Sequence, residues 1–119
     1  MAHQIRGIDI TAYLVKDAER AKAFYRDVMG LRPTWEAEAG AEYALSDGST
    51  FGIWQGDEPW EPSRGVMFAV DDAKEAADYY RARGAKIEAE IFESPVCFMA
   101  FGEDSEGNRF ILHQRKSGA

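Results

Sequence analysis

Short apolar runs and two amphipathic stretches alternate along this chain, a pattern that predicts both strands and helices. In residues 17–29 and again in residues 72–83, apolar side chains recur at helical spacing while charged side chains occupy the other face. Asp72 followed by Glu75 resembles the capping box of a helix start. Runs rich in β-branched and aromatic residues predict strands at 5–15, 34–39, 41–46, 50–55, 65–70, 86–92, 95–102 and 108–114.

The same pattern occurs twice. Residues 15–28 align with residues 70–83 at an offset of 55, with six identities in fourteen positions. Residues 47–55 resemble residues 106–114 at an offset of 59, and share a glycine, a phenylalanine and a glutamine. We therefore predict two βαβββ modules, at about 5–55 and 65–115, joined by the proline-containing linker 56–64.

The predicted fold class is α+β. Two βαβββ modules would form a curved, eight-stranded mixed sheet that encloses a U-shaped cavity, with the helices on its outer face. At 119 residues, of which 45% are hydrophobic, the chain is large enough for one such domain, spanning residues 1–119.

Strand alternation divides the side chains between two faces of this sheet. Val66, Phe68 and Val70 form the bulky set expected to contact the helices, and so do Phe110 and Leu112. Applying the two offsets to the other module gives the predicted inner face: Ile10, Ala12, Leu14, Gly52, Trp54, Gly65, Met67, Ala69, Arg109, Ile111 and His113.

Charge and composition exclude some partners. The formal net charge of −7 disfavours nucleic acid and anionic membranes, which bind proteins chiefly through cationic side chains. No apolar run approaches the length of a membrane span, and the N-terminal residues lack the pattern of a signal peptide, so we expect a cytoplasmic protein. The single cysteine, Cys97, excludes an internal disulfide bond.

These motifs resemble a known family. Val-x-Asp-(x)6-Phe/Tyr-Tyr-Arg, together with the closing stretch 104–114 (DSEGNRFILHQ), is similar to the glyoxalase, bleomycin-resistance and extradiol-dioxygenase family, also called the vicinal oxygen chelate superfamily. The resemblance covers about residues 5–115. It implies paired βαβββ modules around a U-shaped cavity, usually in a homodimer. It leaves the activity open, because the family includes isomerases, dioxygenases, thiol transferases and non-catalytic drug binders.

Enzymes of this family resemble one another in four metal-ligand positions, usually His, Glu or Gln. In this sequence the corresponding positions are Ile10, Gly52, Gly65 and Ile111, and none of these side chains can donate a lone pair to a metal ion. We therefore predict no metal site and no other cofactor.

An inner face without these donors is apolar and aromatic, and it suits a flat hydrophobic small molecule. The predicted ligand-binding residues are Ile10, Ala12, Gly52, Trp54, Gly65, Met67, Met99, Phe101, Arg109, Ile111 and His113. The leading hypothesis is sequestration of a drug or metabolite, as the resemblance to bleomycin-resistance proteins implies. Two other interpretations remain: the side chains fill the space as ordinary core, or the groove is only a dimerisation surface.

A catalytic alternative rests on His113. An imidazole on the inner face would act as a general acid or base without a metal, making the protein a metal-independent lyase or isomerase. Arg109 shares that face and would pair with a carboxylate or phosphate of the ligand. The sequence does not decide whether the protein is an enzyme, or whether the cavity is completed within one chain or across a dimer.

Overall fold

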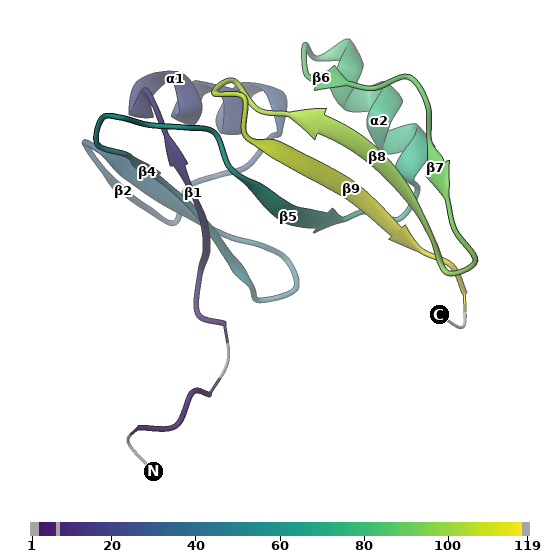
Figure 1. Ribbon diagram of the computed structural model, residues 1–119, viewed down its shortest axis with the longest axis horizontal. Helices are drawn as coiled ribbons and strands as arrows, with labels where there is room; N and C mark the ends of the chain where they lie inside the picture. The colour runs from purple at the N-terminus through teal and green to yellow at the C-terminus, as the bar shows by residue number, and fades with distance from the viewer. Residues whose placement is uncertain (1–2, 7, 118–119) are drawn as a thin grey trace.

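The computed structural model describes residues 3–6 and 8–117, and its elements follow the predicted order. Figure 1 shows them with their labels. They are β1 (Thr11–Val15), α1 (Ala18–Ala23), the π-helix η1 (Phe24–Val28), β2 (Trp35–Ala37), β3 (Gly40–Ala44), β4 (Thr50–Gln55), β5 (Arg64–Ala69), α2 (Ala73–Ala82), β6 (Lys86–Ile87), β7 (Phe92–Glu93), β8 (Cys97–Glu103) and β9 (Arg109–Arg115).

The strands form two mixed sheets. The first has the order β1-β4-β3-β2, and the second has the order β5-β9-β8-β6 with β7 also paired to β8. In each sheet the strand before the helix pairs in parallel with the last strand, while the remaining pairs are antiparallel. Helix α1 packs against β3 and β4, and α2 packs against β8 and β9 (Figure 1). The fold class is α+β, as predicted, but the strands form sheets of four and five rather than one sheet of eight.

The repeated residues form the same contacts in both halves. Asp17 and Asp72 cap the two helices, and each carboxylate accepts a hydrogen bond from the N–H three residues later, at 3.0 and 2.9 Å respectively. Gln55 and Gln114 accept from the first N–H of α1 and α2, at 2.9 and 2.8 Å. Each duplicated glutamine therefore ties the last long strand of its sheet to the start of its helix.

Three predicted elements differ from the structure. The first strand covers only Thr11–Val15 rather than 5–15, because its partner β4 pairs no further back than Thr11. The preceding Ile5 and Ile8 are 94% and 86% exposed. The expected strand 86–92 is divided into β6 and β7, two short segments that each pair with β8. The expected helix 17–29 continues from α1 as the π-helix η1.

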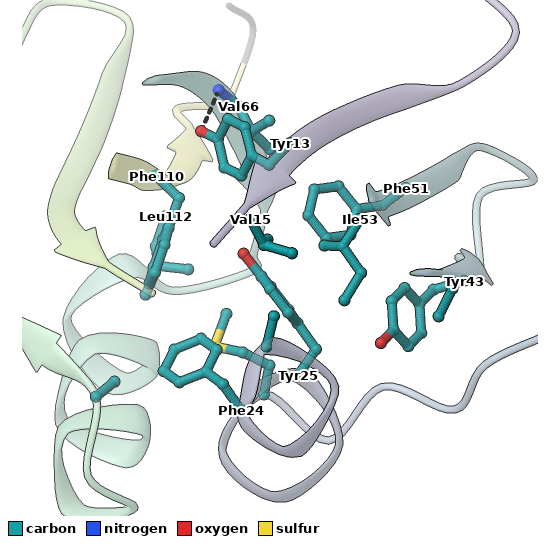
Figure 2. Close-up of a cluster of buried hydrophobic side chains, with 14 of the residues drawn as sticks. Tyr13, Val15, Phe24, Tyr25, Tyr43, Phe51, Ile53, Val66, Phe110 and Leu112 are labelled. Carbon is teal, nitrogen blue, oxygen red and sulfur yellow. Dashed lines mark hydrogen bonds between the residues drawn. The ribbon is translucent and has the colours of Figure 1, made fainter. Parts of the chain in front are cut away.

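The core lies between the sheets and the helices, and it is largely aromatic (Figure 2). Phe51 contacts Phe68 edge-to-face with ring centroids 5.2 Å apart, and Phe68 contacts Phe110 in the same way at 5.7 Å. Val66 is buried, as are Phe110 and Leu112. These strand residues contribute to the core that packs against the helices, as the alternation predicts, so their neighbours in sequence lie on the opposite face.

A tyrosine side chain connects β1 to β5. The Tyr13 hydroxyl accepts a hydrogen bond from the Val66 N–H at 3.0 Å (Figure 2). It also donates a hydrogen bond to the Arg109 carbonyl. Burial raises the pKa of this hydroxyl above its ordinary value of 10.0; the bond from Val66 opposes that shift, and the Asp104 carboxylate adds to it. The neutral hydroxyl can therefore donate and accept at the junction of the two sheets.

The turn between β8 and β9, residues 104–108, also joins the two halves. Asp104 accepts a hydrogen bond from the Tyr25 hydroxyl at 2.8 Å. The Asn108 amide donates to the Leu14 carbonyl at 3.1 Å and accepts from the Ser63 N–H at 2.7 Å. The polar residues that gave the family resemblance thus have a structural role: they satisfy buried groups where the two sheets meet.

Candidate functional site

The predicted inner face is the face that the helices leave uncovered. On the first sheet and just before it, Ile10, Leu14 and Trp54 are 38%, 49% and 47% exposed. Met67 on the second sheet is 51% exposed. These exposures follow the alternation predicted from the sequence, since the intervening strand residues are buried in the core.

The second sheet carries a cavity of about 670 Å³ on this face. Four predicted ligand-binding residues, Gly65, Phe101, Arg109 and Ile111, line it. Phe101 and Ile111 are opposite each other in the β8–β9 ladder and provide apolar surface. A Cβ placed on Gly65 would meet no atom within 4 Å, so the glycine leaves open space in the wall. The cavity is large enough for a small molecule, and its lining combines apolar surface with a few charged groups.

A bulge at Gly65 adds a residue that the sequence did not predict. The register of β5 against β9 shifts between Arg64 and Val66, so that Arg64 rather than Gly65 is the partner of Arg109. Gly65 has a φ of 126°, a conformation that side-chain-bearing residues rarely adopt. The predicted strand began at residue 65, and strict alternation extended back from Val66 would put Arg64 on the helix side. The bulge brings it to the cavity, where it lines the wall beside Arg109.

Four charged residues therefore form one row across the second sheet. In the strand ladders, Arg64 lies opposite Arg109. Arg109 lies opposite Glu103, and Glu103 lies opposite Lys86. All four line the cavity, and so does Glu88. Only Arg109 among them was a predicted site residue. The one sequence signal for the rest was an isolated glycine within a strand, which is typical of a bulge.

The structure separates the first-sheet residues from this cavity. Trp54 stacks on Trp35, with ring centroids 6.4 Å apart and the planes 15° from parallel. Gly52 has less open space than the sequence suggested, because a Cβ there would meet the Ile10 side chain at 3.4 Å and the Ala12 side chain at 3.7 Å. Ile10, Ala12, Gly52 and Trp54 thus form an open surface of the first sheet and are not part of the cavity lining.

Met99 and His113 are partners in the β8–β9 ladder, two residues beyond Phe101 and Ile111, and both are half-buried. Met67 lies across from Ile111 on β5. Among residues 3–6 and 8–117, no side chain forms a hydrogen bond or ion pair with the His113 imidazole. A carboxylate that would orient this ring as a general base is therefore not provided by the described residues.

The four positions that correspond to the metal ligands of the family's enzymes do not fit a metal ion in this chain. Ile10, Gly52, Gly65 and Ile111 offer no donor atom, and the Ile10 side chain lies against Gly52. Within the part of the chain that the structure describes, no group of three or more His, Cys, Asp or Glu side chains is arranged to hold a metal. The chemistry available in the cavity is apolar contact together with charge-assisted hydrogen bonding.

Known structures with the same fold include three of particular interest. The antibiotic-binding protein TnmS3 from Streptomyces sp. CB03234 is 20% identical, with a TM-score of 0.81 over 94% of this chain and 98% of that chain. A glyoxalase/bleomycin resistance protein/dioxygenase from Nocardioides is 16% identical, with a TM-score of 0.76 over 98% and 87%. A glyoxalase-related enzyme from Fulvimarina pelagi is 13% identical, with a TM-score of 0.73 over 92% and 88%.

The sequence itself matches a family model. No curated protein matches the sequence. The model of the Glyoxalase/Bleomycin resistance protein/Dioxygenase superfamily, however, matches residues 7–112, which extend from before β1 into β9 and include both α-helices. The chain therefore belongs to the glyoxalase/bleomycin resistance protein/dioxygenase superfamily.

Proposed function

We propose that this protein binds a small hydrophobic or aromatic molecule without a metal, and sequesters a drug or metabolite in this way. The observation that carries the proposal is the cavity of the second sheet, in which Phe101 and Ile111 offer apolar surface and Gly65 leaves open space. The structural likeness to TnmS3, an antibiotic-binding protein, supports the same class of function.

The energetics of such binding are favourable but modest. Burying about 200 Å² of apolar surface at about 25 cal/mol per Å² contributes roughly 5 kcal/mol before the costs of association. We therefore expect dissociation constants from the high micromolar range to the millimolar range for simple planar ligands.

The test is a calorimetric or NMR titration with 2-naphthamide, a neutral planar probe. We expect the wild-type protein to bind it and Phe101→Ala to weaken binding roughly tenfold, because the ring's apolar contact with the ligand is lost. Tyr79→Ala, which removes an exposed aromatic ring on α2, serves as the control and should bind normally. Failure of the wild type to bind, or equal losses in the two variants, would overturn the proposal.

We also propose that the protein is a cytoplasmic homodimer, with the small molecule as its other partner. Exposed apolar side chains support the dimer. Ile5 and Ile8 are almost fully exposed, in a segment that runs away from the sheets in Figure 1, and Leu14 and Trp54 on the first sheet are about half-exposed. A second copy of the chain would remove this surface from water.

A further inference from the structure

The cavity brings two arginines together on adjacent strands. Arg64 and Arg109 are ladder partners across β5 and β9, where neighbouring strands are about 4.8 Å apart. Both side chains are exposed, and both line the cavity. Like charges directly opposite each other on a sheet destabilise it, so this placement carries a cost in the unbound protein.

Neither arginine forms an ion pair with a carboxylate of the described residues. Within residues 3–6 and 8–117, no carboxylate oxygen lies within 4.0 Å of the Arg64 or Arg109 guanidinium. Most other arginines of the second half are engaged: Arg81 pairs with Asp78, and Arg83 donates to carbonyls of the first half. Both cavity arginines are exposed and without an ion pair, so their side-chain donors are available to a ligand that enters the cavity.

The rest of the row sets the local charge. Glu103 lies opposite Arg109 on one side and Lys86 on the other, and Glu88 completes the charged lining. The cavity thus holds three cations and two carboxylates, in a protein whose formal net charge is −7. Screening at physiological salt limits the overall field of the protein to about 8 Å, so a bound group responds to the charges of the cavity lining, where the three cations outnumber the two carboxylates.

We propose that the cavity selects an apolar, planar molecule that carries a carboxylate, with Arg64 and Arg109 binding the carboxylate and Phe101 and Ile111 contacting the apolar body. This inference rests on the proposed function and adds the charge of the ligand to it. A guanidinium matches a carboxylate with two parallel N–H donors, and a pair on neighbouring strands offers donors to both oxygens. The bulge at Gly65 is what provides the second guanidinium.

The test compares two probes of the same shape and different charge, 2-naphthoate and 2-naphthamide, by isothermal titration calorimetry. We expect the wild-type protein to bind the carboxylate roughly tenfold more tightly than the amide, since hydrogen bonds to charged groups are the stronger ones. This preference should decline as sodium chloride is raised, whereas amide binding should not. Arg64→Gln and Arg109→Gln should each abolish most of the preference while still binding the amide.

Arg115→Gln is the matched control, because Arg115 is an exposed arginine at the other end of β9 and does not line the cavity. It should retain the wild-type preference. Equal binding of both probes by the wild type, or a preference that survives in both cavity variants, would overturn the carboxylate assignment and leave the proposed function standing. If a cavity variant also fails to bind 2-naphthamide, its arginine maintains the shape of the cavity instead of recognising the carboxylate. That result would also contradict the proposal. If the wild-type protein binds neither probe, both proposals are overturned.

Discussion

Asn108 shows what a single side chain does at the junction of the two halves. It is fully buried, and its amide group connects the Leu14 carbonyl of β1, the Ser63 N–H before β5 and the Asp104 carboxylate. Each of these partners would lose a hydrogen bond if the amide were removed. Buried polar groups left unpaired cost about 1–3 kcal/mol each.

We therefore expect Asn108→Ala to lower the free energy of unfolding by about 2–4 kcal/mol, because the buried Asp104 carboxylate, the Leu14 carbonyl and the Ser63 N–H each lose a hydrogen bond. Urea denaturation followed by circular dichroism measures the change. Ser46→Ala, at an exposed turn, is the control and should stay within about 0.5 kcal/mol of wild type. A loss below about 1 kcal/mol for Asn108→Ala would show that water replaces the amide.

The residues that line the cavity show which parts of the site could be predicted from the sequence. Alternation placed Arg109 and Ile111 on the inner face, and the family register placed Phe101 there; all three line the cavity, while their role in ligand binding stays a prediction. Arg64 was missed because the predicted strand began one residue later, and because one extra residue in a strand reverses the parity of everything before it. Gly65 was recognised as a source of open space, but its larger effect is on the direction of its neighbour.

At the scale of the elements, Glu106 links the β8–β9 turn to the start of α1. Its carboxylate accepts hydrogen bonds from the N–H groups of Lys16 and Asp17, at 3.1 and 2.8 Å. Arg20 on α1 forms an ion pair with it at 2.6 Å. Burial acts to raise the pKa of Glu106, but the bonds from Arg20, Asp17 and Ser105 outweigh it, so the pKa lies below its ordinary value of 4.5.

This shift predicts a dependence of stability on pH. Because the folded-state pKa is depressed, ionised Glu106 stabilises the fold above pH 4.5, and that contribution is lost as the pH falls through the folded-state pKa. We expect Glu106→Gln to be less stable than wild type at pH 7 by about 1–2 kcal/mol, a modest value because Arg20 is half-exposed. The difference should shrink below pH 4.5.

Thermal unfolding at pH 3, 5 and 7 measures this change. Glu90→Gln, at an exposed position between β6 and β7, is the matched control and should follow the wild-type profile. A constant difference between Glu106→Gln and wild type at all three pH values would contradict the assigned role of the charge.

For the whole molecule, the exposed N-terminal isoleucines lead to a prediction about assembly. Sedimentation analysis should find the wild-type protein as a dimer at micromolar concentration. The double substitution Ile5→Asp and Ile8→Asp should shift it toward monomer, because the charges would be buried in the interface. Tyr79→Asp, on the exposed face of α2, should leave the dimer intact. A wild-type monomer would contradict the proposed assembly.

No helix among residues 3–6 and 8–117 is long and apolar enough to span a membrane. Both helices are short and use their apolar side chains against the sheets, with α2 burying Ala73 and Ala77 and α1 burying Ala18 and Ala21.

The sequence by itself determined the order of strands and helices, the two helix starts, the division between core and open face, and the family. These features depend on contacts that recur at short, regular spacings, such as the caps at Asp17 and Asp72 and the alternation along β9. The duplication supported these predictions, because the same pattern of residues occurs in each half.

Only the tertiary structure decided how the halves meet and where a cavity lies. The Tyr13 hydroxyl forms a hydrogen bond across the junction of the two halves, and the charged row depends on a register shift at Gly65. Both features are set by contacts between residues far apart in the sequence, where no local period carries information. The place of Arg64 in the site is therefore a property of the folded sheet and not of the strand's own sequence.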